Sequence, residues 1–266
     1  MTNTVYPKGA EKFLTGALDL IDDTIKVALV SDGYTYSAAH EFAASLGTII
    51  GTAQTLANKS ITGGVLDADD ADFGALAPGN NLRAIAIFKD TGNMSTSPLI
   101  AYFDTATGLP MATNGGAITF PWDNTAKKIM RAYLPFFPKG AEKMLTGAVN
   151  FSTDTLKVAL LPSTYTFDTA DEFLADLPTA IGTAQTLGSK TVTGGAFDAA
   201  DADFGNIAPG STIGSAVIYK DTGSPSTSAL LLHITGITGF PLDTNGSGVL
   251  VQWSAGAAKI INLVAP

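Results

Sequence analysis

The sequence predicts a mainly β protein built from two tandem homologous domains, each a β-sandwich or small barrel with one or two short helices. Three observations support this prediction. The chain repeats itself over its whole length at a constant offset of 131 residues. Short β-branched or alternating segments follow one another at roughly 8–12-residue spacing. Turn-forming residues separate them, since the 266 residues include 28 Gly and 13 Pro.

The duplication is clearest in segments 6–30 and 137–161. They read YPKGAEKFLTGALDLIDDTIKVALV and FPKGAEKMLTGAVNFSTDTLKVALL, and 16 of their 25 positions are identical. Further matches at the same offset are GTAQTL, TGG, DADFG, APG and KDTG. The period is far longer than the roughly 20–50 residues of a solenoid repeat, so it indicates duplication of a complete domain.

We place the domain boundary in the segment MRAYLPFFPKG. The first domain then covers residues 1–134 and the second covers residues 135–266. Pro135 and Pro138 flank two aromatic residues at this point, which makes the connection short and stiff. We therefore expect the two domains to be held at a fixed relative angle.

Each repeat is expected to begin with a helix. In the first repeat this is PKGAEKFLTGAL, where a proline suits the helix start. Its apolar residues fall at helical spacing, at Phe13, Leu14, Ala17 and Leu18. The following DTIKVALV alternates and predicts a strand. SAAHEFAASL and its counterpart DTADEFLADL predict a second short helix, N-capped by Ser37 or Asp168.

The rest of each repeat is expected to consist of strands and turns. In the first repeat the expected strands are TIIGTAQTL, KSIT, DADFGAL, LRAIAIFK, PLIAYFD, GAITFPWD and AKKIMRAYL. A GG turn and a DTG turn connect some of them, and Asp and Gly suit hairpin turns. The predicted helix content is therefore low.

Composition excludes several classes of protein. The chain is 45% hydrophobic and 15% charged, which is not the composition of a disordered protein. No apolar run reaches the roughly 18 residues of a membrane span, and MTNTVYPKGAEKF lacks the apolar region of a secretory signal. There is no cysteine, so thiolate chemistry and disulfides are excluded. The net charge of −9, with scattered basic residues, argues against a nucleic-acid partner.

Aspartates gather in two matching segments, Asp67–Asp72 and Asp198–Asp203. One interpretation is a calcium site, because hard cations prefer several oxygen ligands. The spacing lacks the glycine and glutamate of an EF-hand loop, however. The favoured interpretation is a solvated strand edge, with Asp70 and Asp72 outward and Phe73 inward. The prediction is no metal site, while calcium binding by the two runs stays open.

No catalytic constellation is evident. His40 and His233 each match a non-histidine in the other copy, and neither a GxSxG elbow nor a phosphate loop is present. Glu41 and Glu172 match, each beside a phenylalanine, but no partner carboxylate for acid–base chemistry is evident. We predict that the chain is not an enzyme, with no catalytic, cofactor-binding or metal-binding residue.

Two exposed features have both a structural and a functional interpretation. KDTG, at Lys89 and Lys220, is followed by STS in both copies and is either a well-formed turn or a contact loop of a larger assembly. Four aromatic residues could form a sugar-binding platform, although core and strand-edge packing is the favoured interpretation. They are Tyr34, Tyr36, Tyr165 and Phe167.

The chain resembles a family of small structural proteins of tailed bacteriophages, commonly labelled head decoration, minor capsid or minor tail proteins. The resemblance rests on YPKGAEKFLTGALDLIDDTIKVALV, YTYSAAHEF, LIAYFDTATGLP and NGGAITFPWDN. Both halves follow the motif order of this family, in which YKDTG, TSPLIAY, TNGG and a final tryptophan come in turn. The second half departs at DEF, for HEF, and at SALLLH, for SPLIAY. The resemblance implies no catalytic residues.

What the resemblance implies is a non-enzymatic phage virion structural protein. The expected role is that of a capsid decoration or cement protein that binds and stabilises the outer surface of the major capsid shell after assembly in the host cytoplasm. Its partner would be the major capsid protein, with homo-oligomerisation, possibly as a trimer on the shell, and without nucleic acid or membrane. Two linked domains would gain from high effective concentration at neighbouring sites. The alternative is a minor tail or adhesin component that binds host-surface glycan or tail proteins.

Overall fold

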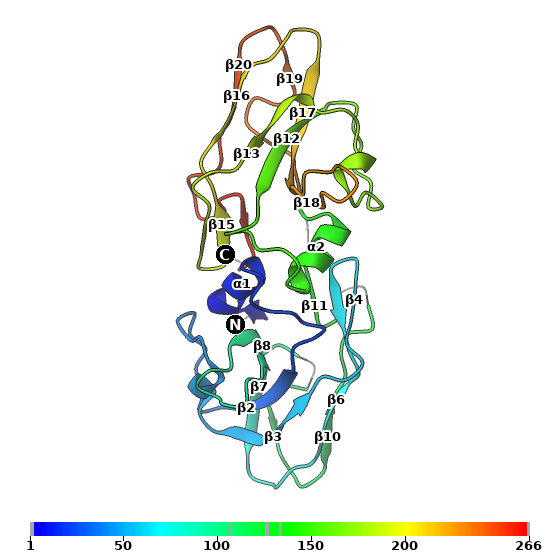
Figure 1. Ribbon diagram of the computed structural model, residues 1–266. Coiled ribbons are helices and arrows are strands. Elements are labelled where there is room, and N and C mark those ends of the chain that lie inside the picture. Colours follow the sequence, from blue (N-terminus) through cyan, green and yellow to red (C-terminus); the bar gives the residue numbers. More distant parts are fainter. Residues whose placement is uncertain (1–2, 107, 126–127, 133–134, 265–266) are drawn as a thin grey trace.

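The computed structural model describes residues 3–106, 108–125, 128–132 and 135–264 (Figure 1). The chain is mainly β, with several antiparallel sheets and two short α-helices, as the sequence predicts. Figure 1 shows an elongated molecule with α1 and α2 near its middle and β-structure extending to both ends.

The elements of the first repeat are β1 (Thr4–Val5), α1 (Pro7–Leu14), β2 (Ile25–Ser31), the 3-10 helix η1 (Ala43–Leu46), β3 (Ile49–Thr55), β4 (Ser60–Thr62), β5 (Val65–Asp67), β6 (Ala71–Ala75), β7 (Asn81–Lys89), β8 (Leu99–Phe103), β9 (Met111–Ala112), β10 (Ala117–Phe120) and β11 (Met130–Arg131). Those of the second are α2 (Pro138–Leu145), β12 (Leu156–Pro162), η2 (Leu174–Asp176), β13 (Ile181–Thr186), β14 (Thr191–Thr193), β15 (Ala196–Asp198), β16 (Ala202–Asn206), β17 (Thr212–Lys220), β18 (Leu230–Ile234), β19 (Leu242–Asp243), β20 (Gly248–Val251) and β21 (Ile261–Asn262).

Each repeat forms one larger sheet and two small ones. The larger sheets have the orders β1-β8-β7-β2-β3, with β9 beside β7, and β13-β12-β17-β18, with β19 beside β17. The small sheets are β10-β6 and β11-β5-β4 in the first repeat, and β16-β20 and β14-β15-β21 in the second. Among the described residues, every strand pair joins two strands of the same repeat, on either side of the boundary expected from the sequence.

The duplication extends to the strand register. Ile25 pairs with Lys89 between β2 and β7, and Leu156 pairs with Lys220 between β12 and β17, at the same offset of 131 residues. Both pairs also contain a register shift at the end of the first strand. The two halves of the sequence therefore specify the same register for this central strand pair.

The first helix begins where the sequence predicts but is shorter. α1 starts at Pro7 and ends at Leu14, because the chain turns at Gly16 with a φ of +64°. Ala17 is consequently exposed, whereas Leu18 is buried beyond the helix. Gly9 is required on the inner face, since a Cβ there would lie 2.5 Å from the carbonyl oxygen of Leu99 in β8.

The second predicted helix is wrong in its position and type. The Ser37 hydroxyl and the Asp168 carboxylate accept the N–H of the residue two positions on, at 3.2 Å and 2.9 Å, which closes a turn instead of capping a helix. Phe42 and Phe173 are then extended, and each forms a β-bridge. Only the short 3-10 helices η1 and η2 follow these bridges.

The remaining predicted strands form, but two of them are shorter than expected. GAITFPWD is a strand only over Ala117–Phe120. Of the expected strand AKKIMRAYL, only Met130–Arg131 forms β11. Lys128 has a φ of +49°, which is incompatible with an extended strand. Residues 126–127 and 133–134 of this segment, and with them part of the proposed boundary, lie outside the described residues.

The hydrophobic core does not stop at the repeat boundary. One cluster of buried side chains includes Leu14 and Leu18 from the first repeat and Leu145 and Phe151 from the second. Two smaller clusters lie on the other faces of the larger sheets, one in each repeat. The two repeats therefore pack against each other through α1, α2 and the segments that follow them.

Candidate functional site

The paired aspartates hold a tryptophan in each repeat. The Asp70 carboxylate accepts the backbone N–H of Trp122 at 3.0 Å, and the indole N–H of Trp122 donates to the carbonyl oxygen of Asp69 at 2.9 Å. In the second repeat the Asp201 carboxylate accepts the backbone N–H of Trp253 at 2.9 Å. This carboxylate therefore fixes the irregular segment after β10 or β20 to the residues just before β6 or β16.

The other shared aspartates also have partners within the protein. Asp67 pairs with Lys128 at 3.2 Å, and Asp198 pairs with Lys259 at 3.1 Å. The Asp72 carboxylate accepts the N–H of Gly74 at 2.9 Å. Within the described residues, no group of three or more His, Cys, Asp or Glu side chains is arranged to hold a metal ion.

His40 follows a turn and is not helical, although the sequence predicts a helix over SAAHEFAASL. Its Nδ1 lies 2.8 Å from the Tyr34 hydroxyl, which in turn lies 2.8 Å from the Tyr6 hydroxyl. Burial raises the pKa of both tyrosines. His40 is thus the outer end of a hydrogen-bonded chain that leads into the smaller core cluster of the first repeat.

His233 lies in β18. Its Nε2 lies 2.9 Å from the Ser215 hydroxyl, and its ring stacks on Phe167 with centroids 5.4 Å apart and planes at 11°. Burial lowers the pKa of His233. Ser215 is only 5% exposed, so its hydroxyl is not accessible as a nucleophile. This His–Ser pair is a buried packing contact.

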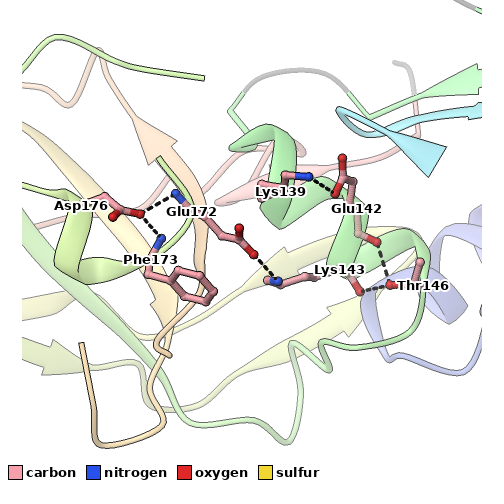
Figure 2. Close-up of polar contacts among 7 residues, drawn as sticks. All are labelled: Lys139, Glu142, Lys143, Thr146, Glu172, Phe173 and Asp176. Carbon is pink, nitrogen blue, oxygen red and sulfur yellow. Dashed lines mark hydrogen bonds and ion pairs between the residues drawn. The ribbon is translucent and has the colours of Figure 1, made fainter. Parts of the chain in front are cut away.

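The matching glutamates form ion pairs with the helices (Figure 2). Glu172 lies 2.9 Å from the Lys143 ammonium of α2, which also lies 5.5 Å from the centroid of the Phe173 ring. Asp176 accepts the backbone N–H groups of Glu172 and Phe173 at 2.9 Å and 2.8 Å, and these two bonds lower the pKa of Asp176.

The first repeat has the same ion pair. Glu41 lies 3.2 Å from the Lys12 ammonium of α1, which lies 6.0 Å from the centroid of the Phe42 ring. In both repeats, then, the glutamate joins the segment before the 3-10 helix to the first helix. Each glutamate is already paired with a cation, and this accounts for its presence in both copies.

The four candidate sugar-binding aromatics pack on other rings. Tyr34 is 6% exposed, and the ring of Tyr36 lies 5.1 Å from that of Tyr6. Phe167 lies 5.0 Å from Phe137, and Tyr165 meets His233 edge-on at 5.4 Å. The rings of these four residues pack against the two smaller core clusters, as the packing interpretation expects.

Sequence reasoning missed a charged hollow in the first repeat. Asp32, Asn81, Arg83 and Asp104 line it, and Asn81 donates to Asp32 at 2.9 Å. Tyr102 lies two positions before Asp104, and its buried hydroxyl makes no hydrogen bond of normal geometry among the described residues; the same holds for Oδ1 of Asp104. The second repeat has Ser163, Thr212, Gly214 and Thr235 at the four matching positions. The charged residues that occur at these positions in the first repeat alone were the signal in the sequence that could have indicated this hollow.

The KDTG elements form the same hydrogen-bonded loop in both repeats; we call residues 89–97 and 220–228 the paired loops. Ser97 is fully buried, donates to the carbonyl oxygen of Asn93 at 2.8 Å and accepts the N–H of Thr91 at 3.1 Å. Ser228 makes the equivalent bonds, to Ser224 and from Thr222, at 2.8 Å and 3.2 Å.

Ion pairs fix the base of each paired loop. Asp90 lies 2.6 Å from the Lys26 ammonium, which holds the pKa of this carboxyl below its usual value. Asp221 is held in the same way by Lys157, at 2.7 Å. Gly92 has a φ of +83°, which the turn requires. Most residues between the base and the buried serine are exposed, so the two loops present rigid polar tips of the same shape.

The α-helices that the structure describes are too short to cross a membrane. Comparisons with protein-family models, with curated proteins and with solved structures find no match for this chain. The paired loops are exposed, and both repeats preserve them in sequence and in hydrogen bonding, which makes them a candidate contact surface.

Proposed function

We propose that this chain is a non-enzymatic structural protein of a tailed-phage virion, and that it decorates the outer surface of the head by binding the major capsid protein. The observation that carries the proposal is the order of motifs shared by both halves of the chain and by the phage family that it resembles. The proposal includes a location on the head and a protein partner, without nucleic acid.

The hydrogen bonds and ion pairs of the polar residues support this proposal over an enzymatic one. The matching aspartates cap turns or form ion pairs, and the matching glutamates hold loops on helices. The histidines differ between copies and are hydrogen-bonded to a tyrosine in one case and a serine in the other. These contacts provide a rigid body, which is what a decoration protein requires.

The paired loops would supply the contacts to the shell. Their tips carry threonine and serine hydroxyls and backbone groups in a fixed geometry, so binding would cost little loop-ordering entropy. Both loops are on one chain, so the second contact benefits from a high effective concentration after the first has formed.

The first test is the copy number of the chain in purified virions, measured by mass spectrometry against the major capsid protein. Hundreds of copies, in proportion to the shell lattice, are expected for decoration. A few to a few dozen copies would favour the tail or vertex role instead. Absence from the particle would overturn both virion roles.

The second test is binding of the purified chain to expanded shells that lack it. Replacing the exposed Thr91 and Thr222 together with arginine should abolish binding. A matched surface variant, Leu250→Arg on β20, should leave binding unchanged, because Leu250 is 52% exposed and lies outside the paired loops. Equal binding by all three proteins would show that the paired loops are not the contact surface.

A further inference from the structure

The two repeats contact each other through bonds that occur twice, with the partners exchanged. The backbone N–H of Leu20 donates to the carbonyl oxygen of Leu145 at 3.0 Å. The N–H of Phe151, which is the counterpart of Leu20, donates to the carbonyl oxygen of Leu14, the counterpart of Leu145, at 2.7 Å. Adding 131 to the number of the donor Leu20 and subtracting 131 from that of the acceptor Leu145 gives the second bond.

A second pair of bonds has the same property. The N–H of Gly63, in the turn after β4, donates to Oε1 of Glu142 in α2 at 2.6 Å. The N–H of Gly194 donates to Oε1 of Glu11 in α1 at 2.5 Å. The other carboxylate oxygen of Glu142 pairs with Lys139 on the same helix, as Figure 2 shows. Both helices thus present a carboxylate to the turn of the opposite repeat.

The close approaches across the interface are paired as well. A Cβ at Gly64 would lie 2.5 Å from the Cβ of Ala141, and a Cβ at Gly195 would lie 2.7 Å from the Cβ of Ala10. Closer to the centre, Gly16 and Gly147 face each other, and a Cβ on either would lie within 3.3 Å of the carbonyl oxygen of the other.

In an isologous, two-fold interface, residue i of one unit contacts residue j of the other, and residue j of the first contacts residue i of the second. The contacts between the two repeats have this property. The side chains that make these contacts are also the same in the two repeats: Glu11 and Glu142, Ala10 and Ala141, and the matching glycines. The remaining bonds are between backbone groups. Each repeat therefore presents a surface that complements the same surface on an identical repeat.

We propose that this surface is a self-complementary dimerisation site, whose partner is a second copy of the same repeat, and that the chain is a covalently joined symmetric dimer. The same two-fold axis then relates the outer surfaces of the two repeats, including the paired loops. If both loops bind at once, their two binding sites on the partner must also be related by a two-fold axis. Because an isologous contact is closed, a trimer of chains would need a different surface.

The test begins with the full chain carrying a protease site inserted between Ala132 and Pro135. After cleavage, native mass spectrometry of the incubated protein should show three dimers: the 1:1 complex near the intact mass of 27.3 kDa, and a homodimer of each fragment. A 1:1 complex alone would overturn self-complementarity. Separated fragments at micromolar concentration would overturn the dimer interface itself. Neither result bears on the virion role.

A glycine variant makes the test specific. In a first-repeat homodimer, Gly64→Ala would introduce two collisions with Ala10; in the 1:1 complex it introduces one, with Ala141; and in a second-repeat homodimer it introduces none. The first-repeat homodimer should lose at least tenfold in abundance, the 1:1 complex less, and the second-repeat homodimer nothing. Gly92→Ala, at a similar positive φ in open space, should not change this distribution. Any other order of losses would overturn the proposal.

Discussion

Gly64→Ala in the intact chain should destabilise the protein much more than a glycine-to-alanine change in an open turn. Gly64 has a φ of +75°, and a Cβ there would lie 2.5 Å from that of Ala141. The positive φ costs about 1–2 kcal/mol for a non-glycine residue. Carbon atoms normally approach to about 3.5–4.0 Å, so the repeats must separate by roughly 1 Å, an overpacking cost of about 1–3 kcal/mol.

The matched control separates these two contributions. Gly92 has a φ of +83° and no atom within 4 Å of a Cβ, so Gly92→Ala should cost only the conformational part, about 1–2 kcal/mol. The measurement is equilibrium urea unfolding of both variants. Gly64→Ala is expected to lower the free energy of unfolding by about 2–5 kcal/mol in total, the sum of the two costs.

A double-mutant cycle tests the cause of the difference. Ala141→Gly removes the opposing Cβ and costs about 1 kcal/mol as a helix substitution. Combined with Gly64→Ala it should recover most of the overpacking cost, which gives a coupling free energy of about 1–3 kcal/mol. Equal destabilisation by Gly64→Ala and Gly92→Ala, or strict additivity in the cycle, would refute the close approach of the two repeats.

Three further predictions concern single sites. Burial lowers the pKa of His233, so the unfolded state takes up a proton at this residue before the folded state does, and stability falls as the pH drops below about 6.5. His233→Phe should therefore flatten this part of a plot of urea midpoint against pH. An unchanged slope would contradict the lowered pKa of His233. Lys26 lowers the pKa of Asp90, so the contribution of Asp90 to stability is complete above about pH 4 and is lost as the pH falls through the folded-state pKa. Asp90→Asn should therefore destabilise the protein at pH 7, and this loss should become smaller as the pH falls below about 4, as urea midpoints measured against pH would show. Ser97→Ala should cost about 1–3 kcal/mol in urea unfolding, because the backbone N–H of Thr91 loses its acceptor, whereas the carbonyl of Asn93 keeps the N–H of Thr96 as a donor. A loss under about 0.5 kcal/mol would show that water replaces the hydroxyl.

The errors of the sequence analysis occur where distant contacts override local preference. The segment around Glu41 has a helical pattern, but Phe42 forms a bridge with Pro98 and the chain there becomes extended. His40 falls within the same predicted helix, but its side chain bonds to Tyr34, six positions earlier. The local sequence pattern does not specify the turn that brings these two side chains together. The hollow around Arg83 was missed because its lining comes from four separate segments, at residues 32, 81–83, 104 and 110–112.

The sequence by itself determined the duplication, the mainly β composition, the start of α1 at Pro7 and the turn chemistry of the paired loops. These features depend on residue spacing and on the conformational preferences of proline and glycine, which act over a few residues. Only the tertiary structure decided how the repeats meet. Glu11 and Gly194 are 183 positions apart, and nothing in either local segment indicates that one binds the other. The two-fold interface arises because two matching surfaces bury their apolar residues and satisfy their backbone groups on each other, and this requires both folded repeats.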